Sequence, residues 1–269
     1  MFHRFLLVCC LLSIVSNAQT DAYSYDKHGR PCKKEDAAFY RTVPQLIDGL
    51  HRFTEYYLDD KIKTTGSYKT LDSLVLTEGV REGYFISYDT LGLKISEGSY
   101  TDDYKSSTWK YYYSGANQLW YVEEYTGKSE GVLQSYYPSG KLKRSEMFAA
   151  MQPSKGKCFD EQGKQIEFTP FLVLPQFPGG ESARNEFLAK NIIYPEIARE
   201  NNLQGRVTVR FVVYEDGTIN DIAVVKAPHI LLAAEAMRVV SLMPKWKPGM
   251  QDDKPAKVSF TLPIRFALE

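Results

Sequence analysis

The side chains that most often carry out catalysis are few in this chain and are scattered along it. The four histidines lie far apart, at His3, His28, His51 and His229. The sequence contains no nucleophile-elbow, zinc-protease, phosphate-loop or dinucleotide-binding motif, and no cysteine–histidine cluster with metal-ligand spacing. Adjacent carboxylates occur at Asp102-Asp103 and Asp252-Asp253, where solvated turns are the ordinary explanation. The sequence therefore predicts a protein that is not an enzyme and has no cofactor or metal.

The backbone near the C-terminus offers a different chemistry, which is hydrogen bonding to another strand. Lys257–Phe266 reads KVSFTLPIRF, and its hydrophobic residues alternate strictly with the others, as in a strand with one buried face. Pro263 has no N–H to donate to a neighbouring strand. Because backbone groups point alternately to the two edges of a strand, Pro263 faces the same edge as Ser259, Thr261 and Arg265. We call this side the outer edge, and the sequence predicts that no strand of the same sheet pairs with it.

Two interpretations of this outer edge fit the residues. Proline is a common means of protecting a free edge from unwanted pairing, so Pro263 can be purely protective. Alternatively, an incoming extended segment pairs with Ser259 and Thr261 and stops near Pro263. The two interpretations are compatible, and residue chemistry alone favours the protective one.

The elements that must position this strand are recognisable upstream. We predict a helix over Glu181–Lys190, a short helix starting at Tyr194-Pro195, a strand over Gly205–Tyr214, a hairpin turn at Asp216-Gly217, a returning strand with a bulge near Asn220, and a helix over Ile230–Met243. Trp246, between two prolines, is expected to fill the core. The order helix, helix, strand, strand, helix, strand predicts an α+β domain with helices packed on a three-stranded antiparallel sheet.

These stretches resemble the C-terminal domain of TonB. The similarity rests on FPGGESARNEFLAKNIIYP, IARENNLQGRVTVRFVVYEDGTINDIAVVKA, EAMRVVSLMPKWKPG and KVSFTLPIRF, in the family's order, over about residues 177–266. The resemblance implies binding of an extended segment of outer-membrane TonB-dependent receptors by strand addition, in energy-coupled transmembrane transport. It implies partner-binding residues at Ser259, Thr261, Pro263, Arg265, Tyr194 and Pro195. Tyr194 either lines the partner groove or only caps the sheet.

The first half of the chain contains a repeat. Gly83 opens GYFISYDTLGLK and Gly131 opens GVLQSYYPSGKL, 48 positions apart, and a third copy begins halfway, at Ser107. Each unit predicts two strands around a glycine turn, and neighbouring units must stack because one hairpin cannot bury a face alone. The pattern resembles a MORN-type repeat variant over about residues 53–166. The repeat therefore predicts an N-terminal all-β meander.

The role of the repeat region is open between two interpretations. Its many tyrosines can form a binding surface, or they can be cross-strand packing pairs in a spacer. In sequence no charged or polar cluster recurs from copy to copy, which favours the spacer. If the tyrosines form a binding surface, the alternative function is that of a structural or adaptor protein of the envelope, which binds through its β-repeat region without energy transduction.

The N-terminus predicts export. A short basic start precedes the apolar run Phe5–Val15, and small residues follow up to Ala18. This is typical of a secretory signal peptide, since a run of eleven residues is shorter than the roughly 20 apolar residues that span a bilayer. Cleavage would give a periplasmic protein. An uncleaved N-terminus would instead anchor it in the inner membrane and allow contact with a proton-channel complex there.

We predict a signal peptide at 1–18, a lead-in at 19–52, the MORN-like β-repeat region at 53–168, a proline-rich linker at 169–180 and the TonB-like domain at 181–269. Basic and acidic residues balance at 33 each, so the charge does not favour nucleic acid as a partner. A homodimer is kept open. Cys32 and Cys158 would survive cleavage, and they either form a disulfide or stay unpaired.

Overall fold

The computed structural model describes residues 22–27, 29–72, 78–150 and 152–268. The predicted signal peptide lies outside these residues. Among the residues described, no helix is both long enough and apolar enough to cross a membrane. The chain divides into two compact units, residues 1–128 and 129–269, which are described separately below. The predicted domain boundaries at 53, 169 and 181 stay predictions.

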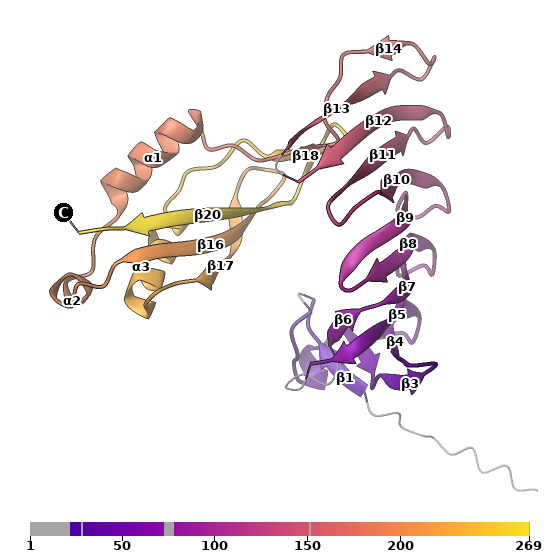
Figure 1. Cartoon of the computed structure of the whole chain (residues 1–269), viewed down its shortest axis with the longest axis horizontal. Helices are drawn as coiled ribbons and strands as arrows, with labels where there is room; N and C mark the ends of the chain where they lie inside the picture. The colour runs from indigo at the N-terminus through magenta and orange to yellow at the C-terminus, as the bar shows by residue number, and fades with distance from the viewer. Residues whose placement is uncertain (1–21, 28, 73–77, 151, 269) are drawn as a thin grey trace, which may run out of the picture. The chain divides into compact units, whose positions relative to one another are not determined.

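The first unit is built from antiparallel strands in hairpins (Figure 1). They are β1 (Ala22–Tyr25), β2 (Phe39–Thr42), β3 (Gln45–Ile47), β4 (Leu50–Tyr57), β5 (Ile62–Leu71), β6 (Gly79–Arg81), β7 (Gly83–Tyr88), β8 (Lys94–Thr101), β9 (Tyr104–Tyr112) and β10 (Leu119–Tyr125), with a short 3-10 helix at Lys34–Asp36. The sheet runs β1-β2-β4-β5-β7-β8-β9-β10, with β3 beside β4 and β6 beside β5. The meander expected from the glycine and tyrosine spacing is therefore present, while the MORN-type resemblance stays a prediction.

A row of aromatic rings explains why the repeat alternates glycine with large side chains. Phe85 and Tyr100 meet edge to face at 4.9 Å between ring centroids, as do Tyr100 and Trp109. The indole of Trp109 lies directly over Gly98, where an added Cβ would be 2.3 Å from the ring. Aromatic pairs of this geometry contribute about 0.5–1.5 kcal/mol beyond the area that they bury. Glycine on one strand thus makes room for the ring on the next.

Glutamates on three strands of the first unit form ion pairs that the sequence did not predict, with Glu55 and Glu97 buried and Glu123 half-buried. Glu55 on β4 pairs with Arg41 and Lys63, both at 2.6 Å. Glu97 on β8 pairs with Lys94 at 2.7 Å, and Glu123 on β10 pairs with a lysine on β9 at 3.0 Å. The sequence did not predict these pairs because each cation lies at a different distance along the chain from its glutamate.

Glu97 gives the first unit a predicted pH dependence. Desolvation by burial raises its pKa, but hydrogen bonds from Lys94, Tyr112 and Tyr84 outweigh burial and hold the pKa at about 2. A folded-state pKa below the unfolded value of roughly 4.3 adds stability above that value, and the stability is lost as pH falls. In urea unfolding of the full chain, we expect the stability difference between the wild type and Glu97→Gln to shrink from about pH 5 to about pH 2. A difference that stays constant over this range would contradict the assignment.

The second unit begins with four more antiparallel strands and continues into the C-terminal domain (Figure 1). Its elements are β11 (Glu130–Tyr136), β12 (Leu142–Ala149), β13 (Gln152–Phe159), β14 (Gln165–Ile166), β15 (Leu172–Val173), α1 (Gly180–Asn191), α2 (Glu196–Glu200), β16 (Gly205–Val213), β17 (Ile219–Lys226), α3 (Ile230–Ser241), β18 (Gly249–Gln251), β19 (Lys254–Ala256) and β20 (Val258–Phe266). The predicted order of helices and strands is confirmed. The small sheet β15-β18-β19 was not predicted.

The C-terminal sheet has the order β17-β16-β20 and is antiparallel throughout. Helix α3 packs on β16 and β17. Trp246 is 3% exposed and its ring meets Phe211 and Phe260 at 5.3 and 5.0 Å, so the predicted core role is confirmed. The predicted bulge is present too, since the register of β17 shifts between Asn220 and Ala223.

Candidate partner-binding strand

Strand β20 lies at one edge of the C-terminal sheet and pairs with β16 over its whole length. Pro263 stands opposite Thr208. In antiparallel pairs, hydrogen-bonded and non-hydrogen-bonded positions alternate, and proline fits only the second kind. The residues flanking Pro263 therefore bond to β16, and the backbone groups of Ser259 and Thr261 point away from it.

The side chains of β20 alternate between a buried face and an exposed face of the sheet. Leu262, Ile264 and Phe266 are each 2% exposed, whereas Ser259, Thr261, Pro263 and Arg265 are exposed. Within the described part of the chain, β16 is the only strand paired with β20. The outer edge thus presents backbone donors and acceptors, with exposed polar side chains on one face.

Tyr194 and Pro195 are not part of β20, and they lie just before α2. The Tyr194 hydroxyl donates to the carbonyl of Leu203, and its ring meets Phe266 edge to face at 5.9 Å. Pro195 precedes the first turn of α2. These contacts favour the interpretation of Tyr194 as a cap on the sheet.

Comparison with protein-family models adds an independent finding. Residues 190–268 match the family of the Gram-negative bacterial TonB protein C-terminal. The match runs from the end of α1 through β20 and supports the resemblance seen in the sequence. Searches of curated proteins and of solved structures gave no match.

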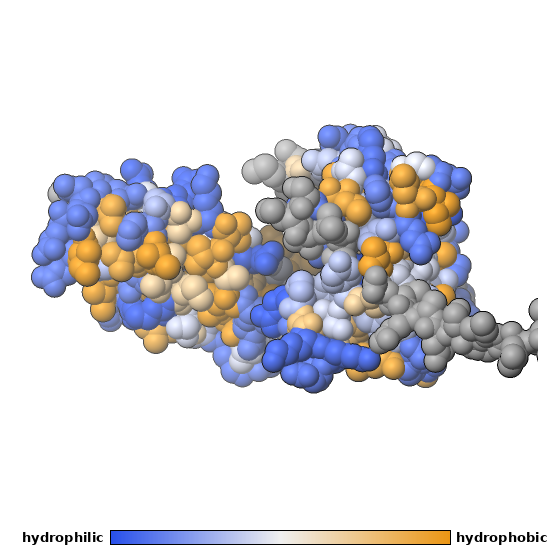
Figure 2. Space-filling view, turned by 90° about the horizontal axis from the view of Figure 1, so that it is seen from below, coloured by the Kyte–Doolittle hydropathy of each residue, from blue (hydrophilic) through white to orange (hydrophobic). Residues whose placement is uncertain are grey.

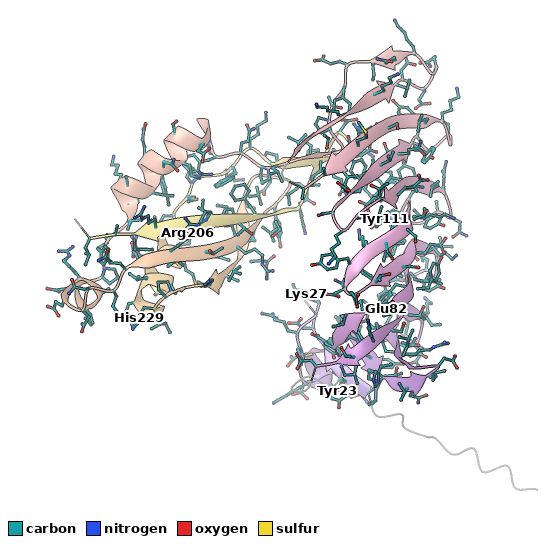
Figure 3. All side chains as sticks on the ribbon, viewed as in Figure 1. Tyr23, Lys27, Glu82, Tyr111, Arg206 and His229 are labelled. Atoms are coloured by element: carbon teal, nitrogen blue, oxygen red, sulfur yellow. The ribbon has the colours of Figure 1, made fainter. Side chains whose placement is uncertain are left out.

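The TonB C-terminal match agrees with a binding domain rather than an enzyme, and with a place in the periplasm or cell envelope. In the described residues, no group of histidine, cysteine, aspartate or glutamate side chains is arranged to hold a metal ion. His229 has a local structural role, since its Nδ1 accepts a hydrogen bond from Leu231 N at the start of α3 (Figure 3). Arg206, on β16, is exposed (Figure 3).

Cys32 and Cys158 are free thiols in the structure, Cys158 buried and Cys32 half-buried. They belong to different units, so the disulfide stays a prediction. The homodimer also stays a prediction. Hydrophobic surface suited to a contact exists on the TonB-like domain, where Val225 of β17 and Ile230 of α3 are exposed (Figure 2).

The entry into β20 is held by a group of charged residues that the sequence did not reveal. Asp252 is 4% exposed and Arg144 is fully buried, which corrects the expectation of a solvated turn for Asp252, whereas Asp253 is exposed as expected. Arg144 donates from Nη1 to Asp252 Oδ1 at 2.7 Å and from Nη2 to Asp253 Oδ1 at 2.9 Å. Its Nε donates to the carbonyl of Thr169 at 2.8 Å. Lys143 lies 3.0 Å from both carboxylates.

We call these five residues the Arg144 cluster. It ties the β18–β19 hairpin and the proline-rich segment to β12, so the predicted linker is packed against the last repeat hairpins instead of spanning solvent. Asp252 and Asp253 form the hairpin turn with φ values of 50° and 67°. A non-glycine residue there costs of order 1–3 kcal/mol and persists where its surroundings hold it. The cluster supplies that restraint at the turn directly before β19, and β19 leads into β20.

Proposed function

We propose that the TonB-like domain binds an extended segment of an outer-membrane receptor, which adds as a strand along the outer edge of β20. The observation that carries this proposal is the open outer edge, with the backbone groups of Ser259, Thr261 and Arg265 directed away from β16. An extended peptide recognised in this way gains affinity from main-chain hydrogen bonds. Pro263 would end the pairing, because it offers only a carbonyl on that side.

The family match supports a biological setting in the periplasm or cell envelope. A protein that captures receptor segments in the periplasm serves energy-coupled transmembrane transport if it also reaches the proton-channel complex of the inner membrane. That second contact requires an uncleaved N-terminal anchor. The N-terminal residue of the purified native protein decides between the two settings, because a start at Gln19 would remove the anchor.

A backbone substitution tests strand addition directly. Thr261→Pro removes one outward N–H and leaves the hydrogen bonds to β16 in place, since the Thr261 N–H points to the outer edge. We expect the full chain to bind a synthetic receptor N-terminal peptide at least tenfold more weakly, from the loss of roughly 1.5 kcal/mol for one hydrogen bond and the added steric block. Isothermal titration calorimetry measures this loss.

Thr261→Val is the matched control, because it changes the exposed side chain and keeps the backbone N–H. Its affinity should stay within about twofold of the wild type. Equal weakening by both substitutions would assign binding to the side chain. Unchanged binding by Thr261→Pro would remove β20 as the docking strand.

The repeat region supports a second candidate function, capture of an envelope partner by the first unit. A hollow of about 450 Å³ there is lined by Tyr88, Lys94, Tyr112 and Asn117 among others. Partner capture from an envelope extract that persists in Thr261→Pro but fails in Tyr112→Ala would favour an adaptor role. The reverse pattern favours strand addition.

A further inference from the structure

Two buried donors in the TonB-like domain have no hydrogen-bond partner. Among the described residues, the buried side-chain nitrogen and oxygen atoms in this condition are Nε of Arg184 and Nε1 of Trp246. Leaving such a group unsatisfied costs about 1–3 kcal/mol, so each one calls for an explanation. Both residues line the same hollow.

This hollow measures about 250 Å³ and is formed by three separate segments. Pro175, Gln176 and Phe177 come from the segment before α1, Gly180, Glu181 and Arg184 come from the start of α1, and Trp246 and Phe260 complete the lining. A single water occupies roughly 30 Å³ of liquid, so the space suits several waters or one polar side chain. We call it the Trp246 hollow.

The Trp246 hollow adjoins the outer edge of β20. Phe260 lines it and stands between Ser259 and Thr261, whose backbone groups point outward. Figure 1 shows α1, which supplies the facing residues, next to β20. An added strand would lie about 4.8 Å from β20, and its side chains would alternate between the two faces of the sheet. A side chain on the same face as Phe260 would therefore be directed toward the hollow.

The polar groups that line the Trp246 hollow indicate which kind of partner side chain it would bind. Both unpartnered groups are donors, and one belongs to a guanidinium. Arg184 contacts Glu181 through Nη2 at 2.7 Å, but the Glu181 side chain is 78% exposed, so this pair is solvated and weak. A carboxylate accepts several hydrogen bonds and is attracted by arginine, whereas an amide would bring two further donors.

We propose that the Trp246 hollow is a specificity subsite for an acidic side chain of the incoming segment, whose carboxylate oxygens accept from Arg184 Nε and Trp246 Nε1. The subsite rests on the proposed strand addition and adds a preference that backbone pairing cannot supply. Peptides that carry glutamate or aspartate at the position facing Phe260 bind more tightly than those with a neutral residue there.

A double-mutant cycle on the full chain tests this preference. A receptor peptide is prepared with glutamate, glutamine or alanine at the position facing Phe260, and each is titrated into the wild type and Arg184→Gln. We expect the glutamate peptide to lose about tenfold in affinity in Arg184→Gln, and the alanine peptide to lose almost nothing. Arg206→Gln, which removes an exposed arginine from β16, is the control and leaves all three affinities unchanged. Equal losses for all peptides, or equal affinity of the glutamate and glutamine peptides for the wild type, would overturn the subsite.

A second measurement separates failure of the subsite from failure of strand addition. Sodium propionate is titrated into the 15N-labelled full chain, and the indole N–H signal of Trp246 is assigned by its loss in Trp246→Phe. We expect a saturable shift of that signal in the wild type that disappears in Arg184→Gln. Absence of the shift overturns the subsite whether or not peptides bind. A shift without any peptide binding would overturn strand addition and leave the carboxylate site standing.

Discussion

Replacing Arg144 by methionine is expected to lower the free energy of unfolding of the second unit by about 3–5 kcal/mol, the usual effect of breaking a buried ion pair from one side. Arg144 is fully buried, and its removal leaves Asp252, 4% exposed, without its closest cation. Methionine fills similar space and Lys143 stays 3.0 Å from Asp252, so the loss reports the weakened compensation of a buried charge more than a cavity. Hydrogen exchange of amides in β12, β16 and β20 measures the effect in the full chain.

Two further variants show where the energy resides. Arg206→Met, the matched exposed substitution on β16, should change stability by less than about 0.5 kcal/mol. Adding Asp252→Asn to Arg144→Met should recover part of the loss, because the carboxylate no longer needs a cation. A loss below about 1 kcal/mol for Arg144→Met alone would show that the Arg144 cluster is not a stabilising junction.

The Arg144 cluster bears on the proposed function because it holds the hairpin that leads into β20, the proposed docking strand. Hydrogen bonds from Lys143 and Thr169 lower the pKa of Asp253 although desolvation by burial opposes them, so the carboxylate stays charged next to Arg144. The turn that carries Asp253 leads through β19 into β20. Tension applied to a strand bound at the outer edge would therefore reach the last repeat hairpins through this cluster.

Local patterns in the sequence predicted the elements that obey them. The alternation in β20, the Asp216-Gly217 turn and the glycine spacing of the repeat hairpins each depend on residues close together in the chain, and each was found. The edge position of β20 could be argued from Pro263 alone, since a strand inside a sheet needs the N–H that proline lacks, whereas an edge strand does not.

Features made by distant residues could not be predicted in this way. Arg144 meets Asp252 across 108 positions, and Arg184 and Trp246 come together only after folding. The strands β15, β18 and β19 are two or three residues long, too short for a periodic pattern. One local signal was available, because aspartate tolerates positive φ, and an Asp-Asp pair between short strands is compatible with a two-residue hairpin turn.

Gly217→Ala is expected to destabilise the second unit by about 2–5 kcal/mol, because two penalties add. Gly217 has φ +84°, which costs an alanine about 1–2 kcal/mol. An added Cβ would also lie 2.2 Å from the backbone carbonyl oxygen of Trp246. Relieving that overlap costs a further 1–3 kcal/mol or so, since a backbone atom cannot rotate away. Chemical denaturation of the 15N-labelled full chain, followed by the indole N–H signal of Trp246, measures the loss.

Gly140→Ala isolates the first penalty within the same unit. Gly140 occupies the same position in its hairpin loop as Gly217 does in its own. The Gly140 N–H donates to the carbonyl of Tyr137, just as the Gly217 N–H donates to the carbonyl of Tyr214. The φ of Gly140 is +81°. No atom lies within 4 Å of its added Cβ, so its loss should stay at about 1–2 kcal/mol. Equal losses of stability at the two glycines would mean that the backbone at Trp246 shifts to accommodate the added Cβ at little cost. A larger loss at Gly217 means that this hairpin fixes the backbone of Trp246, and with it the wall of the hollow beside β20.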